Sequence, residues 1–342
     1  MRVLQVDSGR EWRGGQNQVR LLCRELAKAA GVEQLLVTKR ESELARRAAA
    51  DGTPVAEAPW GIGLDPRAWW RLKRVIAAFA PDVVHAHDSH ALALVIGRGR
   101  GALVATRRVD FHIGRLSAWR RADRVIAISE AVKTVLIHDG LPATDISIVP
   151  SGIDSEEIRR AARQPLNVRT RLTLGPRTPL VVNVAALVDH KDQRTLIRAA
   201  HHARTLRPDL HWAIAGEGVL RGSLEAEIAR LELGDRVHLL GYVEEADALI
   251  READVFVMSS QEEGLGSVIL NALALDKPVV ATAGGGIPEI LPPQALVPVG
   301  DAAALARKVV ETLDHPSPFP LPPQFTASAM AQGVLAVYRS LL

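Results

Sequence analysis

Short runs rich in Val and Ile recur along this chain of 342 residues, and longer stretches with the apolar spacing of helices separate most of them. This alternation is typical of parallel strands joined by crossover helices. A first series of strands is expected near residues 3–6, 34–37, 54–56, 83–85, 103–106, 125–128 and 146–149. A second series is expected near residues 180–184, 211–215, 237–240, 255–257, 279–281 and 295–297. The chain is therefore predicted to have an α/β fold, with two Rossmann-like doubly wound domains that face a cleft.

The length also favours two domains, because single cores stop growing at about 250–300 residues. We expect an N-terminal domain over residues 1–164 and a C-terminal domain over 165–324, joined through a polar stretch. Prolines at 316–323 must keep that segment extended, since proline fixes φ. A terminal helix over 325–342, with Thr326 as its cap, is predicted to pack back on the first domain.

The composition excludes several classes of protein. Hydrophobic residues make up 47% of the chain and charged residues 24%, which is typical of a globular protein rather than a disordered or fibrous one. The single cysteine, Cys23, cannot form an internal disulfide, so a reducing compartment fits. The N-terminus begins directly with a strand pattern and lacks the features of a signal peptide. We therefore expect a cytoplasmic protein.

Charge is unevenly distributed along the chain. Residues 1–150 contain 23 Lys and Arg against 16 Asp and Glu, whereas the remainder contains 19 against 23. The segment 60–74 combines Trp69 and Trp70 with four cations, which are Arg67, Arg71, Lys73 and Arg74. Such a helix suits an anionic membrane surface, so one expectation is that the protein attaches peripherally to the inner face of the membrane. The alternative is that the tryptophans pack inward and the cations are solvated. Nucleic acid is not expected, because stacking aromatics are not interleaved with the cations.

The segment with the most chemical information follows the strand expected at 255–257. The strand ends in serines at 259–260. The segment then continues through Glu263, Gly264 and Gly266, and a helix is expected to begin near Ser267. Free N–H groups at a helix N-terminus favour a phosphate. Glu263 would repel that phosphate, so it is expected to accept hydrogen bonds from sugar hydroxyls instead. The alternative is a plain helix cap with a solvated acidic turn.

Seven further segments, in order along the chain, resemble one known family. They are residues 13–16 (RGGQ), 81–87 (PDVVHAH), 122–130 (ADRVIAISE), 149–154 (VPSGID), 187–199 (LVDHKD followed by LI and A), 215–218 (AGEG) and 240–243 (LGYV). Together with Glu263 they resemble the retaining family-four glycosyltransferases of the GT-B fold. The resemblance implies that the domain over residues 1–164 lies on the acceptor side and that the domain over 165–324 binds the nucleotide sugar. The Glu-x7-Glu motif of that family is altered here to Glu263-x7-Asn271.

The resemblance implies roles for individual residues. Lys191 would bind the diphosphate of the donor and stabilise it as it leaves, while Glu263 would hold hydroxyls of the donor sugar. Arg108 completes the candidate catalytic set. The resemblance implies that the other donor-binding residues are Gly14, Gly15, Tyr242, Val243, Gly264, Leu265, Gly266, Ser267 and Asn271.

Three positions depart from the pattern of the family. Asn271 replaces the second Glu, Ala186 stands where an Arg often precedes the phosphate Lys, and Arg108 stands where an active-site His is frequent. We therefore expect Arg107 or Arg108 to supply the missing positive charge. A protein without those charges could also be a non-catalytic or divergent binder of sugar nucleotides.

His85 and His87 share one face of an expected strand, and the resemblance implies that they lie on the acceptor side. Two imidazoles at this spacing could instead bind zinc, as in a metallohydrolase. Because no Asp-x-Asp occurs in the chain, no metal and no cofactor are expected.

The function implied by the resemblance is a retaining, metal-independent transfer of a sugar. The donor would be a nucleotide diphosphate sugar and the acceptor a hydroxyl of a glycan, a lipid-linked or an anionic molecule, as in the synthesis of cell-envelope polysaccharide or lipopolysaccharide. An epimerase or phosphorylase is the weaker alternative, since neither paired carboxylates nor a cofactor lysine is evident. The donor base, the sugar, the acceptor and the oligomeric state stay open.

Overall fold

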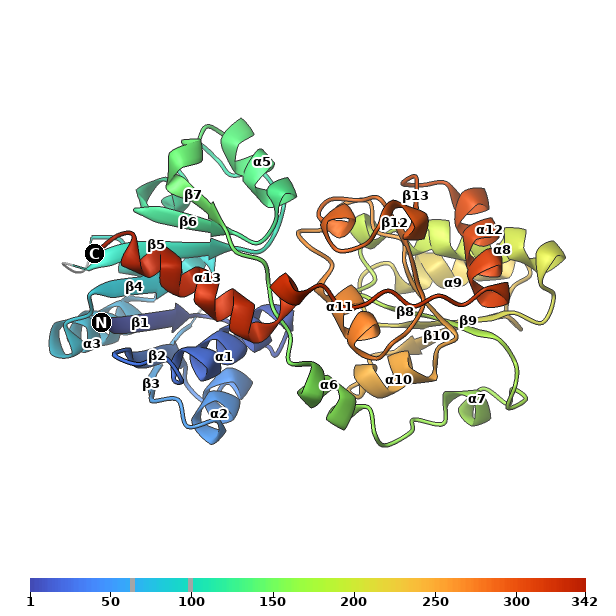
Figure 1. Cartoon of the computed structure of the whole chain (residues 1–342), viewed down its shortest axis with the longest axis horizontal. Coiled ribbons are helices and arrows are strands. Elements are labelled where there is room, and N and C mark those ends of the chain that lie inside the picture. The colour runs from blue at the N-terminus through green and yellow to red at the C-terminus, as the bar shows by residue number, and fades with distance from the viewer. Residues whose placement is uncertain (62–64, 98–100) are drawn as a thin grey trace. The chain divides into compact units, whose positions relative to one another are not determined.

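The structure is a computed structural model that describes residues 1–61, 65–97 and 101–342. It divides into two compact units (Figure 1). The first comprises Met1–Ile153 and Pro323–Leu342, and the second comprises Asp154–Pro322. The second unit begins before the expected residue 165 because helix α6 (Ser155–Ala161) packs on helices of that unit.

The described residues of the first unit form a seven-stranded parallel sheet in the order β3-β2-β1-β4-β5-β6-β7. Its strands are β1 Arg2–Asp7, β2 Glu33–Lys39, β3 Val55–Ala58, β4 Val83–Ala86, β5 Ala102–Arg107, β6 Arg124–Ala127 and β7 Ile146–Ile148. Its helices are α1 Gly14–Leu26, α2 Glu43–Ala50, α3 Pro66–Phe79, α4 Ser89–Val95 and α5 Glu130–His138, with 3-10 turns η1 Ala118–Arg121 and η2 Ala143–Asp145. The strand order reverses between β1 and β4, which makes this the switch point of the sheet.

The second unit contains a parallel sheet in the order β10-β9-β8-β11-β12-β13. Its strands are β8 Leu180–Val184, β9 His211–Ala215, β10 Val237–Gly241, β11 Val255–Met258, β12 Val279–Thr282 and β13 Leu296–Val297. Besides α6, its helices are α7 Val168–Arg171, α8 Gln193–Leu206, α9 Arg221–Arg230, α10 Ala246–Glu252, α11 Ser267–Ala274 and α12 Ala302–Asp314, with turns η3 Asp189–Lys191, η4 Ile287–Glu289 and η5 Pro293–Ala295. The switch point of this sheet lies between β8 and β11.

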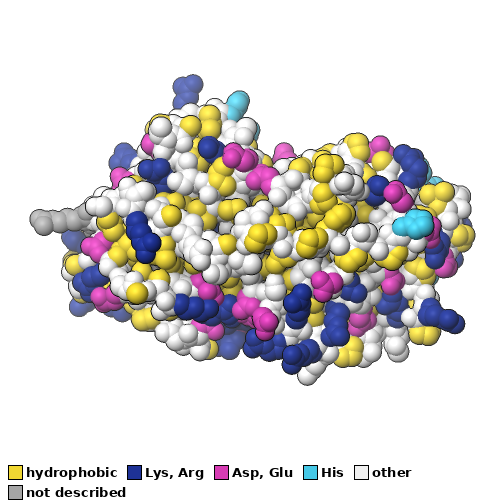
Figure 2. All heavy atoms as spheres, viewed as in Figure 1, with side chains coloured by type: hydrophobic (Ala, Val, Ile, Leu, Met, Phe, Trp, Pro, Cys, Tyr) yellow, Lys and Arg dark blue, Asp and Glu magenta, His cyan; other side chains and the backbone are white. Residues whose placement is uncertain are grey.

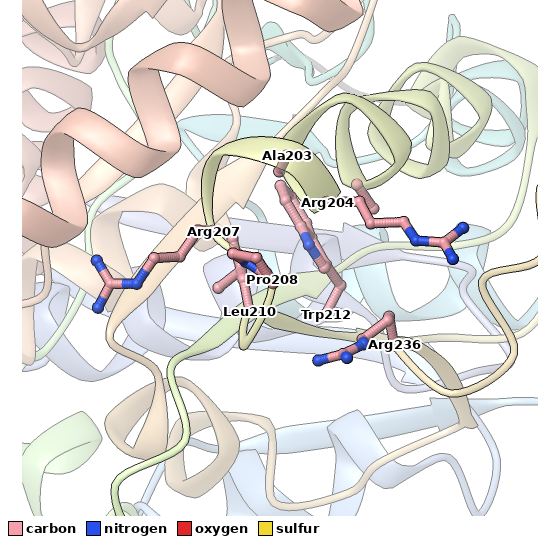
Figure 3. Close-up of a pocket in the computed structure, with 8 residues that line it drawn as sticks. Ala203, Arg204, Arg207, Pro208, Leu210, Trp212 and Arg236 are labelled. Carbon is pink, nitrogen blue, oxygen red and sulfur yellow. The ribbon is translucent and has the colours of Figure 1, made fainter.

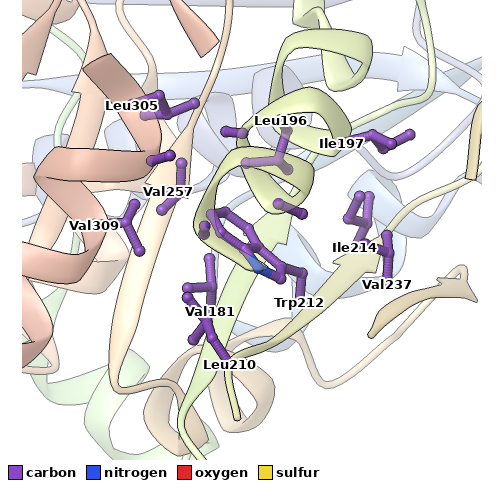
Figure 4. Close-up of a cluster of buried hydrophobic side chains, with 14 of the residues drawn as sticks. Val181, Leu196, Ile197, Leu210, Trp212, Ile214, Val237, Val257, Leu305 and Val309 are labelled. Carbon is purple, nitrogen blue, oxygen red and sulfur yellow. The ribbon is translucent and has the colours of Figure 1, made fainter. Parts of the chain in front are cut away.

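The two parallel sheets confirm the expected α/β fold class, and every strand predicted from the sequence is present. The strands are continuous apolar runs because both faces of a parallel sheet are covered by helices. In the second unit, Figure 4 shows Trp212 of β9 among aliphatic side chains from α8, α12 and the sheet. Trp212 and Leu305 are almost completely buried, and this core holds the sheet and its helices together.

The chain returns to the first unit at its C-terminus, through turn η6 (Pro323–Phe325) and helix α13 (Ala327–Arg339) (Figure 1). Thr326 caps α13 by accepting a hydrogen bond from the N–H of Ala329 at 3.2 Å, which confirms the predicted cap. Val334 and Tyr338 are buried in one cluster with Leu22 of α1 and Val149. The terminal helix is therefore part of the core of the first unit.

Two tryptophans of the segment 60–74, Trp69 and Trp70, lie on α3. Residues 62–64 of this segment are outside the described residues. Trp70 is 61% exposed, so it does not pack inward. Lys73 lies over both indole rings, at 5.5 Å from Trp69 and 5.9 Å from Trp70. On the face in Figure 2, basic and acidic side chains are intermixed and form no large patch of one sign. None of the described helices is both long and apolar enough to cross a bilayer.

Candidate active site

The second unit gathers charged side chains at its β8/β11 switch point. Lys191 belongs to the turn that follows β8, and Glu263 belongs to the loop that follows β11. The carboxyl ends of adjacent parallel strands meet at one edge of the sheet, where ligands of open α/β sheets bind. The structure therefore brings together the two residues to which the sequence assigned the leaving group and the donor sugar.

Lys191 and Glu263 form an ion pair. The ammonium Nζ donates a hydrogen bond to Oε2 of Glu263, and the side chains are only 17% and 14% exposed. The hydroxyl of Ser260 donates to the same carboxylate oxygen at 3.2 Å. A pair this sheltered from water interacts more strongly than an exposed one.

Backbone contacts position both members of the pair. The carbonyl of Lys191 accepts a hydrogen bond from the Ser259 hydroxyl at 2.9 Å, and the N–H of Gly286 donates to the carbonyl of Glu263 at 2.7 Å. Gly285 has a φ of +53°, and a Cβ there would lie 2.1 Å from the Glu263 carbonyl oxygen. The glycine turn at 284–286 thus packs against the Glu263 loop and accepts no larger residue.

Helix α11 begins next to this pair with an open N-terminus. Gly266 is its N-cap in the left-handed region at φ +83°, without a side-chain cap and without an acidic residue in the first turn. Within the described residues, the N–H groups of Gly266 and Ser267 have no acceptor. The side chain of Leu265 is buried, so that residue and Gly264 offer only backbone groups. An anion at this helix end would be stabilised by the free N–H groups.

Helix α8, which directly follows Lys191, offers no such position. Its N-cap Asp192 accepts a hydrogen bond from the N–H of Thr195 at 3.2 Å and from the Thr195 hydroxyl at 2.7 Å. A carboxylate already occupies that helix end, where a phosphate would be repelled. Of the two helices near Lys191, α11 is therefore the better site for a phosphate.

Tyr242 and Val243 follow β10 at the edge of the same sheet, and the Tyr242 side chain is 71% exposed. Asn271 lies on α11, and its amide donates a hydrogen bond to Oδ1 of Asp247 on α10 at 2.7 Å. Burial raises the pKa of Asp247, while the Asn271 bond lowers it. Sequence reasoning missed Asp247. This residue places a carboxyl group next to Asn271, where the motif of the family has its second Glu.

In the first unit, Gly14 and Gly15 form the first turn of α1. A Cβ on Gly15 would meet only Cδ of Arg108, at 3.9 Å. Packing within this unit therefore does not demand glycine at position 15, and the open space beside it is available to a ligand.

Arg108 lies beside a buried polar network at the carboxyl ends of β1 and β4. Its guanidinium donates to the carbonyl of His87 at 2.9 Å and lies 3.2 Å from Nδ1 of the same residue. Burial lowers the pKa of Arg108 to about 10, and the carboxylates of Asp7 and Asp88 oppose that shift. Arg108 is therefore cationic at neutral pH. Sequence reasoning missed Asp7 and Asp88, which a search for polar residues directly after β1 and β4 would have found.

His85 and His87 are not exposed to an acceptor. His85 is fully buried, with Nδ1 2.6 Å from the Tyr338 hydroxyl and Nε2 2.7 Å from the Thr106 hydroxyl. His87 is 4% exposed, and its Nε2 lies 2.8 Å from Oε1 of Gln5. The pair is therefore held by hydrogen bonds at the carboxyl end of β4, where His85 connects α13 to the sheet, and its acceptor-side position stays a prediction. A zinc site on the pair is not supported either, because all four ring nitrogens have protein partners and one of these is the Arg108 cation.

Arg107 is held by the loop that follows β5. Its guanidinium donates to the carbonyl of Phe111 at 2.7 Å and lies over the Trp119 ring, 5.2 Å from the centroid. Burial lowers its pKa. Arg107 thus stabilises the loop, whereas Arg108 is the cation next to the glycine turn of α1.

A hollow elsewhere in the second unit is too small for a ligand. It lies between the end of α8 and the start of β9, where Figure 3 shows Trp212 and Leu210 with arginines around them. Its volume is about 10 Å³, which is room for about one water molecule. It also lies at the amino end of the strands, away from the Lys191 and Glu263 pair.

Comparisons with known proteins agree with this arrangement in both units. The Glycosyltransferase Family 4 model matches residues 12–157, and the Glycosyl transferases group 1 model matches residues 167–329. The 2-deoxystreptamine glucosyltransferase of Streptomyces kanamyceticus is 26% identical over 264 residues, covering 75% of this chain and 68% of that protein. The amylovoran biosynthesis glycosyltransferase AmsK of Erwinia amylovora is 30% identical over 197 residues, covering 53% of this chain and 45% of that protein.

A solved structure has the same fold. The crystal structure of HepE from Anabaena in complex with UDP-glucose superposes with a TM-score of 0.76 at 21% identity, covering 100% of this chain and 95% of the other. The two family models together span most of both units, and the fold agrees with them. The chain is therefore a glycosyltransferase of the GT-B fold and belongs to glycosyltransferase family 4.

Proposed function

We propose that this protein transfers a sugar, with retention of configuration, from a nucleotide diphosphate sugar to a hydroxyl group. The observation that carries the proposal is the sheltered Lys191 and Glu263 pair beside the open N-terminus of α11. One cation and a set of free N–H groups can neutralise a diphosphate, and one carboxylate can accept hydrogen bonds from sugar hydroxyls. HepE, a structural neighbour solved with UDP-glucose, supports a donor of this class.

The chemical step needs stabilisation of the leaving diphosphate. Lys191 would exchange Glu263 for a phosphate oxygen, and the N–H groups of Gly266 and Ser267 would donate to the same group. Charge develops on that group as the glycosidic bond breaks, so these donors act most strongly in the transition state. Glu263, released from Lys191, would then hold the donor sugar. With retention, the acceptor attacks the face that the diphosphate leaves, and a diphosphate oxygen takes the acceptor proton.

The remaining donor contacts follow from the same edge of the sheet. Tyr242 and Val243 would frame the base through their backbone groups. Asn271 and Asp247, linked at 2.7 Å, would together hold the ribose hydroxyls. The carboxyl group of Asp247, beside the amide of Asn271, would supply the hydrogen-bond acceptor that the altered motif lacks.

The acceptor is proposed to be a glycan, a lipid-linked molecule or another anionic molecule used in polysaccharide synthesis. The relative AmsK, named for amylovoran biosynthesis, supports a polysaccharide. We further propose that the protein works at an anionic membrane surface, because Trp70 is exposed on α3 next to Lys73. Catalysis is proposed to be independent of metal, since Lys191 and the α11 N-terminus provide the positive charge that a metal ion would otherwise supply.

A second candidate is a binder of sugar nucleotides without transfer activity. The exposed Ala186, which takes the place of an expected cation, favours it. The test is a mass-spectrometric transfer assay with UDP, GDP and ADP sugars in the presence of EDTA, followed by NMR of the product anomer. Retained configuration with EDTA present supports the proposal. Donor binding without turnover across a panel of acceptors would favour the binder, and an inverted product would contradict the retaining mechanism.

A further inference from the structure

The first unit contains a cavity of its own at the carboxyl edge of its sheet. Its volume is about 330 Å³, and three segments line it: residues 8–10 after β1, residues 60–61 after β3, and residues 88–90, which follow β4 and begin α4. Two of these segments flank the β1/β4 switch point, where open α/β sheets bind their ligands. The size is at the lower end of the range of about 300–1,000 Å³ for ligand pockets, which suits a monosaccharide.

The walls of this cavity are held by side chains. Asp88 accepts hydrogen bonds from the N–H of Ser8 at 2.7 Å and from the Ser8 hydroxyl at 2.6 Å. It also accepts from the N–H groups of His90 and Ala91, both at 2.9 Å. The N–H of Gly61 donates to Asp65 at 2.9 Å. The site is thus largely formed before a ligand arrives, and the Asp88 carboxylate is occupied by four donors.

Three side chains of the cavity have chemistry to offer a ligand. Trp60 is 5% exposed, and its buried indole N–H has no acceptor among the described residues. The small exposed part of its ring adds an apolar, aromatic edge to the wall. Arg10 and His90 are exposed, and neither side chain has an ion pair or hydrogen bond within the described residues. The cavity therefore combines an aromatic surface with an uncompensated cation.

That combination matches one class of ligand. A pyranose has apolar C–H groups that can contact the small exposed part of the Trp60 ring, and its hydroxyls can bond with Ser89 and His90. Guanidinium groups bind carboxylates and phosphates through paired N–H donors. The Asp88 carboxylate is held in place by its four donors, and Arg10, which has no ion pair within the described residues, is the cation of the cavity that can attract an anionic substituent of the sugar.

We propose that this cavity is the acceptor subsite and that it binds a pyranose carrying a carboxylate or a phosphate. The sugar ring lies against Trp60 and the anionic group lies on Arg10. This inference rests on the proposed glycosyl transfer and narrows its acceptor to an acidic or phosphorylated sugar.

The test measures binding of sugars to the full chain without a donor, by isothermal titration. The probes are methyl β-glucuronide, glucose 6-phosphate and methyl β-glucoside. We expect one of the two anionic sugars to bind at least about tenfold more tightly than the glucoside, and its identity separates a carboxylate from a phosphate ligand. Arg10→Gln should remove that advantage, whereas Arg121→Gln, which changes an exposed arginine of η1 outside the cavity, should keep it. Trp60→Phe, which keeps a ring and is safer for folding than Trp60→Ala, should weaken every bound probe by a smaller factor.

The proposal is overturned if no probe binds, if the glucoside binds as tightly as the anionic sugars, or if Arg121→Gln weakens binding as much as Arg10→Gln. A parallel titration with UDP, GDP and ADP reports on the second unit alone. Nucleotide binding without sugar binding contradicts the acceptor subsite and leaves the proposed transfer standing. Binding of an anionic sugar without binding of any nucleotide contradicts the proposed transfer and supports the cavity as a sugar site.

Discussion

The ammonium group of Lys191 is hydrogen-bonded to the carboxylate of Glu263, 72 residues further along the chain. Each residue follows a different strand, and the pair forms only because β8 and β11 are neighbours in the sheet. A donor that binds Lys191 through its diphosphate must break this pair. The two residues are therefore expected to respond differently to substitution.

Glu263→Gln is predicted to strengthen the binding of UDP without sugar and to weaken transfer. Loss of the carboxylate frees Lys191 for the diphosphate, but the Gln amide oxygen can still accept a weaker hydrogen bond, so only part of the about 1.5–3 kcal/mol of a hydrogen bond to a charged group is released. We expect UDP affinity to rise by roughly three- to tenfold and the transfer rate to fall by at least tenfold. Titration calorimetry and initial rates measure the two effects. Glu262→Gln, which changes the exposed neighbour, is the control, and weaker UDP binding by Glu263→Gln would contradict the exchange of partners.

Lys191→Met is predicted to reduce UDP affinity by roughly ten- to a hundredfold, because the charged donor to the phosphate is lost. Calorimetric titration measures the change. Lys308→Met, on α12 and paired with Glu311, should leave affinity unchanged. Equal UDP binding by the wild type and Lys191→Met would remove Lys191 from the donor site.

Gly285→Ala is predicted to destabilise the second unit and to lower activity. An alanine Cβ would lie 2.1 Å from the Glu263 carbonyl oxygen, and the left-handed backbone adds about 1–2 kcal/mol of strain. We expect a lower melting temperature together with reduced transfer. Gly222→Ala is the matched control: this glycine lies in α9 with nothing within 4 Å of the added Cβ, so the change should stabilise by about 0.5–1 kcal/mol. A melting temperature unchanged by Gly285→Ala would show that the turn can move.

Asp7→Asn is predicted to change how stability depends on pH. Burial and the neighbouring Asp88 raise the pKa of Asp7 from 3.8 to about 6, so its ionisation is disfavoured in the folded state. The wild type therefore loses stability as pH rises from about 4 to 6, by on the order of 2–3 kcal/mol, and no more above that. Asn carries no such charge, so the stability of Asp7→Asn relative to the wild type should rise over this window and then level off. Urea denaturation between pH 4 and pH 8 measures it, with Asp145→Asn in η2 as the control. A stability difference independent of pH would be the opposite result.

Trp70→Ala is predicted to reduce binding to anionic vesicles. The exposed indole on α3 would be lost from the proposed membrane face, along with its contact to Lys73. Sedimentation with phosphatidylcholine vesicles, with and without phosphatidylglycerol, measures the effect. Leu206→Ala on α8, another half-exposed apolar side chain, serves as the control. If the wild type binds neither vesicle, the membrane proposal is wrong.

The sequence by itself determined the elements and their order. Runs of Val and Ile marked the strands, and Thr326 marked the start of α13, because apolar periodicity and helix caps are local properties. The glycines and Glu263 after β11 likewise predicted the proposed donor segment, since an anion site at a helix N-terminus is encoded by adjacent residues.

Only the tertiary structure decided which side chains meet. Tyr338 is hydrogen-bonded to His85 from 253 positions away, Asp192 caps the N-terminus of α8, and Asp247 meets Asn271 through the packing of α10 on α11. Likewise, Trp60 and Arg10 line one cavity because their loops end at the same edge of a sheet. Such contacts depend on strand order and helix packing, which join residues far apart in the chain. The apolar periodicity of a segment indicates which of its faces is buried. It does not indicate which other helix or strand packs against that face.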